Sequence, residues 1–325
     1  MFSIILPVYN SERFISNTIE SVLNQTFKDY ELIIINDGST DKTFDICKKY
    51  SEDNKNIYLI NQKNLGASEA RNKGIYNAKN EYLIFLDSDD ELDSDFLEVL
   101  NRKLESNKVD VLFFGFKLIE DGRVRKNILD IKSNDFKNII YELISNDVFG
   151  YQCCKAIKRN IIIDNNICLD KKISINEDLV FTCNILDFTS KIDFYELAGY
   201  NYLIRKDSLS RRFNANIIIE QNKVFSIYSR FLISHNIRNK EKLLINRAYL
   251  SLMVIFYGFI NNTIIINKKN FSDLKNSSFY KYIDKYNYKK DVRGRRKYLY
   301  YILKFSNFNI FKNFMIVLIR KFLNN

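Results

Sequence analysis

Three carboxylates crowd the end of an apolar run in the first third of the chain. Residues 82–86 are apolar, and Asp87, Asp89 and Asp90 follow them almost without interruption. In open α/β sheets, ligands bind outside the carboxyl ends of the strands. Mg²⁺ and Mn²⁺ take oxygen ligands there, typically one or two carboxylates together with substrate phosphates. This segment therefore indicates a site for a divalent cation and a phosphate.

The same acids permit a second interpretation. Asp89, Asp90, Glu91 and Asp93 also fit a solvated start of a helix that runs from about Ser94, where the helix dipole favours acidic side chains. Acid clusters in turns are common. The cluster by itself leaves the cation site and the helix start as equal alternatives.

The elements that would position these acids alternate along the first 116 residues. Apolar runs predict strands at residues 2–8, 31–35, 57–60, 82–86 and 110–118. Helical patterns separate these strands. They cover residues 10–25, a segment that ends at about residue 50, residues 67–78, and a segment that begins at about residue 94. This alternation is typical of an α/β fold with a mixed, mostly parallel sheet flanked by helices.

Two further strand ends carry polar side chains. Tyr9, Asn10 and Glu12 follow the first strand, and Asp37 ends the second. Side chains of these types can hold a nucleotide. The structural alternative is that Asn10 or Ser11 caps one helix and that Thr40 or Asp41 caps the next.

The second half of the chain has a different pattern. A helix is expected at 133–145, short mixed elements follow near 150–155, and helical patterns dominate from about residue 212. We therefore predict two parts, a domain over residues 1–210 and a mainly α-helical C-terminal region over residues 211–325. The uncharged stretch 248–266 is interrupted by polar residues, which favours a buried helix over a membrane span.

Cysteine content and charge narrow the classes of function. The five cysteines are odd in number and form no CxxC pair, which argues against a disulfide framework and against a zinc site. The N-terminus shows no secretion signal, so a reduced cytoplasmic location is expected. Residues 289–325 hold ten basic residues and one acidic residue, a net charge of +9. Since the whole chain carries +11, residues 1–288 carry only +2.

Four motifs appear in an order and at spacings that resemble those of glycosyltransferase family 2. They are residues 3–10, 36–41, 64–66 with 70–72, and 86–90. Lys155 and residues 176–181, 200–202 and 205–210 are similar to the later part of bacterial surface-polysaccharide members, such as those of capsule or lipopolysaccharide synthesis. The resemblance covers about residues 2–211.

That resemblance implies a GT-A fold, which is Rossmann-like, and inverting transfer from a nucleotide-sugar, commonly a UDP-sugar. By position it implies a nucleoside pocket of Pro7, Tyr9 and Glu12, Asp37 on the uracil, Arg71 beside the base, Asp87 on the ribose, Asp89 on a Mn²⁺ or Mg²⁺ ion, and Asp178 as general base. A base is needed because the acceptor hydroxyl must lose its proton as it attacks. From the residues alone, Asp178 also fits the first turn of a helix.

The chain contains no tryptophan, so the QxxRW motif of processive relatives is absent. We therefore expect a non-processive transferase that acts on a saccharide or a lipid-linked saccharide. The alternative is a nucleic-acid- or membrane-binding scaffold with an inactive transferase fold. The intact Asp87, Asp89 and Asp178 argue against a scaffold, and no helix-turn-helix, zinc or RNA-binding signature supports binding of nucleic acid.

The basic tail at 289–325 leaves two alternatives open. In a helix, Phe308, Phe311, Met315, Leu318 and Phe322 would share one face. This pattern fits an interfacial helix on anionic lipid, which would place the protein peripherally at the inner face of the plasma membrane. It fits equally well a helix that packs on its own domain.

Overall fold

The computed structural model describes residues 1–133, 135–204, 215–260, 264–265, 267–286, 304 and 307–323. The chain divides into two compact units, Met1–Lys171 with Asp178–Ser208, and Lys172–Glu177 with Leu209–Asn325. The predicted boundary lies near residue 210, which agrees with Leu209, but the prediction places segment 172–177 in the first part, whereas the structure places it in the second unit. That segment precedes Asp178 directly.

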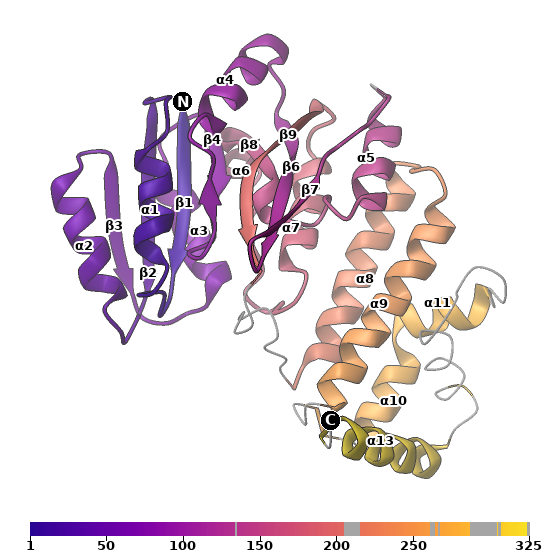
Figure 1. Cartoon of the computed structure of the whole chain (residues 1–325). Coiled ribbons are helices and arrows are strands. Elements are labelled where there is room, and N and C mark those ends of the chain that lie inside the picture. Colours follow the sequence, from indigo (N-terminus) through magenta and orange to yellow (C-terminus); the bar gives the residue numbers. More distant parts are fainter. Residues whose placement is uncertain are drawn as a thin grey trace. The chain divides into compact units, whose positions relative to one another are not determined.

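One mixed sheet forms the centre of the first unit (Figure 1). Its nine described strands are β1 (Phe2–Val8), β2 (Tyr30–Asp37), β3 (Ile57–Gln62), β4 (Tyr82–Phe85), β5 (Glu91–Leu92), β6 (Val111–Glu120), β7 (Arg123–Asn127), β8 (Lys155–Lys158) and β9 (Ile192–Leu203). Their order is β3-β2-β1-β4-β8-β6-β9-β5, and β7 pairs with β6. The predicted α/β class with a sheet flanked by helices is confirmed.

Strand direction decides which loops meet. β1, β2, β3 and β4 are mutually parallel, so the loops after them open at one edge of the sheet. β8 is antiparallel both to β4 and to β6, and therefore enters the sheet at the edge where β4 ends. This edge is the one at which the sequence predicts a ligand.

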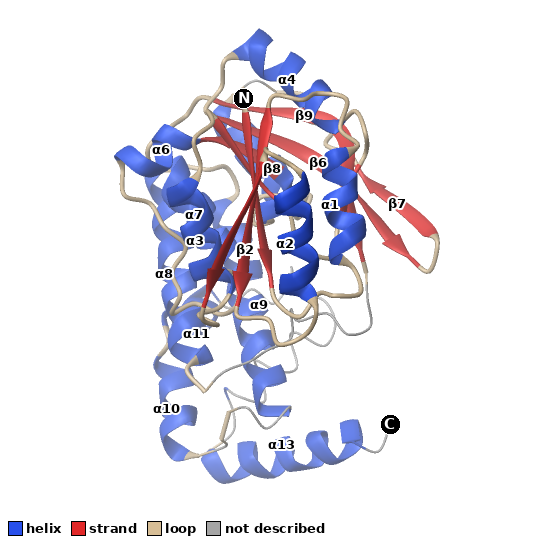
Figure 2. Ribbon diagram, turned by 90° about the vertical axis from the view of Figure 1, so that its left-hand side faces the viewer, coloured by secondary structure: helices blue, strands red, loops and turns tan. Residues whose placement is uncertain are grey.

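Helices cover both faces of this sheet. Figure 2 shows α1 (Ile15–Leu23) and α2 (Thr43–Asp53) on one face and α3 (Ala67–Asn77) and α7 (Glu177–Leu186) on the other. The remaining helical elements of this unit are α4 (Phe96–Asn107), α5 (Phe136–Ser145), the 3₁₀ turn η1 (Gln152–Cys154) and α6 (Arg159–Asp164). α3 approaches β1 and β2 so closely that a Cβ on Gly74 would collide with Ile5 and lie 2.9 Å from Ile35 Cδ1. Glycine at residue 74 therefore sets the distance of this helix from the sheet.

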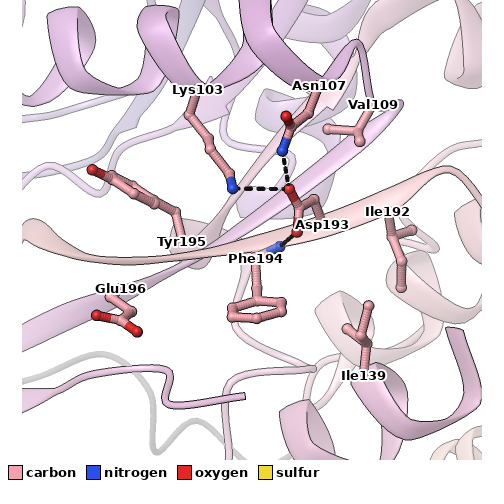
Figure 3. Close-up of a pocket in the computed structure, with 9 residues that line it drawn as sticks. All are labelled: Lys103, Asn107, Val109, Ile139, Ile192, Asp193, Phe194, Tyr195 and Glu196. Atoms are coloured by element: carbon pink, nitrogen blue, oxygen red, sulfur yellow. Dashed lines mark hydrogen bonds and ion pairs between the residues drawn. The ribbon is translucent and has the colours of Figure 1, made fainter. Parts of the chain in front are cut away.

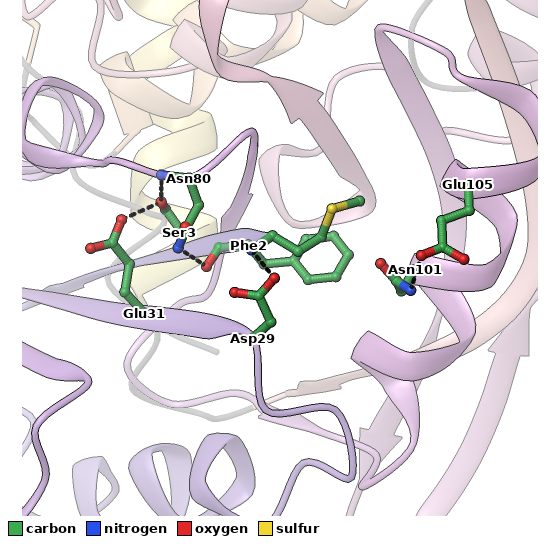
Figure 4. A network of polar contacts seen from close by, with 8 residues as sticks. Phe2, Ser3, Asp29, Glu31, Asn80, Asn101 and Glu105 are labelled. Atoms are coloured by element: carbon green, nitrogen blue, oxygen red, sulfur yellow. Dashed lines mark hydrogen bonds and ion pairs between the residues drawn. The ribbon is translucent and has the colours of Figure 1, made fainter.

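A polar network fixes the opposite edge of the same strands (Figure 4). The Ser3 hydroxyl donates to Glu31 Oε1 at 2.6 Å and accepts a bond from the Asn80 backbone N–H at 3.1 Å. The Asn80 side-chain amide donates to the Phe2 carbonyl at 2.8 Å. Because both Ser3 and Glu31 are buried, these bonds satisfy groups that would otherwise destabilise the ends of β1 and β2.

The first helix is shorter than predicted. α1 begins at Ile15 rather than at residue 10, and no side chain caps it. Asn10 has a φ of +49°, which no helix accommodates, and its side chain accepts a bond from the Thr40 N–H at 2.8 Å. The capping alternative is therefore wrong for Asn10, whose side chain joins two loops. Asp41 does accept a bond from the Thr43 N–H at 3.0 Å in the first turn of α2.

The second unit is helical in its described parts, as the sequence predicts. Its helices are α8 (Ile217–Ser234), α9 (Lys240–Ile260), α10 (Lys268–Asn276), α11 (Ser278–Tyr286) and α13 (Phe308–Leu323). Arg247 is buried in α9 and donates to Asn176 Oδ1 at 2.6 Å and to Gln221 Oε1 at 2.9 Å. Ser174 donates from its N–H and its hydroxyl to Glu220. These bonds tie segment 172–177 to α8 and α9.

α9 is long and apolar enough to cross a membrane by composition alone, but 67% of that apolar window is buried inside the protein. This supports the predicted buried helix over residues 248–260, whereas residues 261–263 and 266 lie outside the described part.

The described beginning of α13 packs within its own unit. Phe311 and Met315 are fully buried. The Phe311 ring lies 5.9 Å from that of Phe256, 5.7 Å from that of Phe259 and 5.0 Å from that of Phe271. The packing alternative therefore holds for this turn of the tail. The side chains of Leu318 and Phe322, and residues 289–303, lie outside the described residues.

Candidate functional site

Asp87 and Arg71 form an ion pair at the end of β4. Arg71, in the second turn of α3, places Nη2 2.8 Å from Asp87 Oδ1, and the two side chains are 11% and 37% exposed. The sequence assigns these residues to one nucleoside, on its base and its ribose. The structure brings them together and leaves part of the Asp87 carboxylate accessible to a ligand.

Asp37 is buried and organises the loop that leads to α3. Its Oδ1 accepts bonds from Gln62 Nε2 and the Leu65 N–H, both at 2.8 Å, and its Oδ2 accepts one from the Gly66 N–H at 2.8 Å. Two carboxylate oxygens accept about four bonds. Asp37 therefore retains capacity for about one further donor, such as the imide N–H of a base, in addition to its structural role.

The loops after β1, β2 and β4 are bonded to one another. The hydroxyls of Ser11 and Ser88 lie 2.7 Å apart, and the Ser11 N–H donates to Thr43 Oγ1 at 2.7 Å. Glu12 is exposed and its Oε2 accepts a bond from the Lys42 N–H at 3.0 Å. Glu12 therefore links two loops, in addition to the nucleoside role that the resemblance implies.

Pro7 and Tyr9 complete this edge. Pro7 is half-buried within β1, opposite Ile35 of β2, and Tyr9 is half-buried just beyond the end of β1. Pro7 lies in, and Tyr9 directly follows, the strand that pairs with β2 on one side and β4 on the other. The predicted nucleoside residues therefore come from adjacent strands at one edge of the sheet.

Asp90 differs from the other acids of the cluster. It is 1% exposed, and its Oδ2 accepts a bond from the Tyr200 hydroxyl at 2.7 Å and its Oδ1 one from the Leu203 N–H at 2.9 Å. The Tyr200 hydroxyl in turn accepts a bond from the Asp87 N–H at 3.2 Å. Burial, and next the charge of Asp87, raise the pKa of Asp90 to about 8. The solvated helix start is therefore wrong for Asp90, and Glu91 opens strand β5 instead.

Segment 150–155 lies between the acidic cluster and the first turn of α7. A Cβ on Gly150 would lie 3.6 Å from Leu179 Cβ, and Phe181 of α7 contacts Phe85 of β4 with ring centroids 6.2 Å apart. Lys155 is fully buried; burial lowers the pKa of its ammonium group, and the Asp178 carboxylate acts in the opposite direction. Asp178, half-buried at the start of α7, therefore faces the same region as the end of β4.

The donor set fits a divalent cation that also binds phosphate. Asp87 and Asp89 are half-buried and carry charge that raises the pKa of Asp90, which indicates a surplus of negative charge at this edge. Among the described residues, no group of three His, Cys, Asp or Glu side chains converges on one point. One or two carboxylates supplemented by phosphate and water is the arrangement that Mg²⁺ prefers.

A separate cavity of about 610 Å³ opens at the other edge of the sheet (Figure 3). It lies at the start of β9, which runs parallel to β6, and Asp193 there contacts both Lys103, at 3.0 Å, and Asn107 of α4. These charged and polar groups satisfy one another. The cavity lies far along the strands from Asp87 and does not contribute to the candidate site.

Sequence reasoning missed Tyr200 as a partner of Asp87 and Asp90. Residues 200–202 carried part of the resemblance, but the residues gave no sign that the Tyr200 hydroxyl would reach the acidic cluster. Residues 205–210, which also carried the resemblance, lie outside the described part.

A family model described as "Glycosyl transferase family 2" matches residues 3–165. A cholesterol galactosyltransferase of Borreliella burgdorferi is 30% identical over 285 residues, which cover 83% of this chain and 77% of that protein. The minor teichoic acid biosynthesis protein GgaB of Bacillus subtilis is 29% identical over 307 residues, which cover 83% of this chain but only 34% of GgaB.

Among solved structures, a crystal structure of S. aureus TarS 1-349 in complex with UDP superposes with a TM-score of 0.67. The superposition covers 95% of this chain and 88% of the TarS chain, and the two sequences are 18% identical. At this identity the match establishes the shared fold.

Proposed function

The chain belongs to glycosyltransferase family 2, and we propose that it transfers one sugar per encounter from a UDP-sugar to an acceptor hydroxyl, with inversion at the sugar. The observation that carries this proposal is the edge at which Arg71, Asp37 and Asp87 lie on neighbouring elements, with Asp178 facing the same region. A uridine donor is supported by the remaining acceptor capacity of Asp37 and by the UDP in the TarS structure of the same fold.

In this proposal the residues divide the work between donor and acceptor. Asp37 accepts the imide N–H of uracil, and Pro7, Tyr9 and Glu12 border the nucleoside. Arg71 lies beside the base, and Asp87, its ion-pair partner, contacts the ribose. Asp89, with the phosphates, holds Mn²⁺ or Mg²⁺, which when bound offsets the charge of the diphosphate. Asp178 accepts the proton of the acceptor hydroxyl on the side opposite the leaving group.

The acceptor that we propose is a saccharide or a lipid-linked saccharide in bacterial surface-glycan synthesis. The name of GgaB supports this class, since it refers to teichoic acid biosynthesis. The other relative is named for a sterol, so its name supports a lipid acceptor and not a saccharide. We place this transfer at the cytoplasmic face of the membrane, where a peripherally bound protein would meet a lipid-linked acceptor.

A donor panel tests this function on the full chain. Release of the nucleoside diphosphate is measured with UDP-glucose, UDP-galactose, UDP-N-acetylglucosamine and GDP-mannose, each with Mn²⁺ and with EDTA, and thermal stabilisation is recorded for each nucleotide-sugar. We expect turnover with a UDP-sugar that EDTA abolishes. Stabilisation by GDP-mannose alone would contradict the uridine assignment of Asp37.

The base is tested by Asp178→Asn in the same assay. This change removes the proton acceptor while keeping the shape of the side chain, so transfer should fall by about 10²–10⁴-fold with an unchanged Kd for the donor. Asp187→Asn is the matched control, because Asp187 is exposed directly after α7. Transfer at the wild-type rate by Asp178→Asn would remove the assignment.

A further inference from the structure

Gln152 carries a buried side-chain amide that the protein leaves unused. The residue is 5% exposed, and neither its Nε2 nor its Oε1 has a hydrogen-bond partner among the described residues. Buried side-chain amides in native proteins are almost always bonded, because an unpaired polar group loses its water without compensation. A buried amide whose nitrogen and oxygen both lack partners is therefore unusual and indicates a role outside the packing of the free protein.

Its position in the fold gives the amide a possible use. Gln152 opens the turn η1, which leads directly into β8. In the antiparallel register of β8 with β4, Ala156 pairs with Ile84, so the residues before Lys155 lie beside the end of β4 and the start of the acidic cluster. Asp87 and Asp90 both raise the pKa of the adjacent Cys153, although its bond with Cys154 and burial contribute more.

The other side of the same turn lies near the candidate base. The Tyr151 carbonyl accepts hydrogen bonds from the Cys154 N–H and from the buried ammonium group of Lys155. Burial lowers the pKa of that ammonium group, and the negative charge of Asp178 partly offsets this lowering. Gly150 lies against Leu179 in the first turn of α7. Gln152 therefore lies between the edge that we assign to the diphosphate and the residue that we assign as base.

A transferred sugar must occupy the space between a leaving diphosphate and a general base. We propose that the Gln152 amide binds a polar substituent of the transferred donor sugar, and that Gln152 is a specificity-determining residue. This inference rests on the proposed function. The amide offers one donor group and one acceptor at once, which matches a sugar hydroxyl pair or an N-acetyl group.

The unpaired state in the free protein favours this use. The amide atoms are covered in the free protein, so contact with the sugar requires rotation of the flexible Gln152 side chain toward the site. Rotation gives the amide the bonds that it lacks inside the protein. A donor with the matching substituent therefore gains binding that one without it does not.

The test replaces Gln152 by Met, which has a similar length and no hydrogen-bonding group. Kd is measured for UDP, which lacks the sugar, and for UDP-glucose, UDP-galactose and UDP-N-acetylglucosamine. We expect unchanged binding of UDP, about tenfold weaker binding of the preferred UDP-sugar, and reduced discrimination among the three sugars. Wild-type affinities for all three UDP-sugars in Gln152→Met would overturn the inference.

Thermal unfolding without ligand provides an independent readout. Because its amide has no partners, Gln152→Met should leave Tm unchanged or raise it. Gln25→Met is the matched control, because Gln25 is fully buried and bonds to the Ser21 and Asp93 carbonyls and to the Leu97 N–H. That variant should lower Tm. A loss of Tm in Gln152→Met equal to that in Gln25→Met would show a paired, structural amide and overturn the inference.

Failure of the proposed function is distinguishable from failure of this inference. If wild-type protein binds neither UDP nor any UDP-sugar, the function itself is wrong, and the inference falls with it. If wild-type protein binds UDP and UDP-sugars but Gln152→Met changes no sugar affinity, only the role of Gln152 is wrong.

Discussion

Asp90 lies one residue from Asp89, but burial gives the two carboxylates different roles. Asp90 receives bonds from Tyr200 and from the Leu203 backbone and is almost fully buried, whereas Asp89 is half-buried at the edge of the site. Through the Tyr200 hydroxyl, Asp90 is connected to the backbone of Asp87. Asp90 is therefore a positioning residue that joins the end of β4 to β9.

This environment predicts a stability that depends on pH. Burial and the charges of Asp87 and Asp89 raise the pKa of Asp90 from 3.8 to about 8 in the folded protein. The folded state therefore holds a proton that the unfolded state releases, and stability should fall as pH rises from about 4 to about 8. In Asp90→Asn, which resembles the protonated acid, this fall should shrink by an amount on the order of a few kcal/mol.

Thermal unfolding between pH 5 and pH 8, with EDTA present to keep cations from the acids, measures this difference. Asp45→Asn is the control, since Asp45 is an exposed carboxylate in the first turn of α2. Parallel curves of Tm against pH for wild type and Asp90→Asn would show that Asp90 is ionised in the folded protein.

At the residue scale, the sequence predicted positions better than partners. Asp87 and Asp89 could be placed at a strand end because the apolar run before them is uninterrupted. The burial of Asp90 could not be predicted, since its partner Tyr200 lies 110 positions along the chain and belongs to a strand that local pattern does not reveal. The unpaired amide of Gln152 could not be predicted either, because it results from how distant segments pack around the side chain.

At the scale of elements, the sequence predicted best the strands that consist of an uninterrupted apolar run. β1, β2 and β4 were predicted within a few residues, because each is a parallel strand whose residues are almost all buried. β3 was predicted from its apolar residues, although it lies at the edge of the sheet and only Ile57 in it is buried. β7 was missed because its residues are mostly exposed, and β5 because it is only two residues long. β8 is as short as β4 but has a lysine at each end instead of an uninterrupted apolar run. No local pattern indicates that β8 enters the sheet between β4 and β6.

The packing of α13 gives a prediction about one element. Phe311 is fully buried among Phe256, Phe259 and Phe271, so Phe311→Ala should lower the free energy of unfolding by about 3 kcal/mol. Its neighbour Ile310 is 55% exposed, and Ile310→Ala should change that free energy by less than about 0.5 kcal/mol. Urea unfolding of both variants compares them. Equal effects would show that α13 does not use this face for packing.

At the scale of the whole molecule, charge and apolar packing separate within the tail. Residues 289–325 carry a net charge of +9, whereas residues 1–288 carry +2. Because Phe311 and Met315 are buried inside the second unit and Phe308 is half-buried, little of the described part of the apolar face is available to lipid. Any attraction to a membrane should therefore depend mainly on the basic side chains, and so on salt.

We expect full-length protein to float with vesicles that contain anionic lipid at low salt, and to be released at high salt, because each basic residue near such a surface contributes about 1 kcal/mol. Replacing Arg293, Arg295, Arg296 and Lys297 by Gln should abolish most of this flotation, since the change removes four positive charges and leaves Phe311 in place. Vesicles of neutral lipid are the control for apolar insertion. Equal recovery of wild type and the four-residue variant with anionic vesicles would show that the basic tail does not bind membrane, and recovery with neutral vesicles would point to an apolar contact elsewhere in the chain.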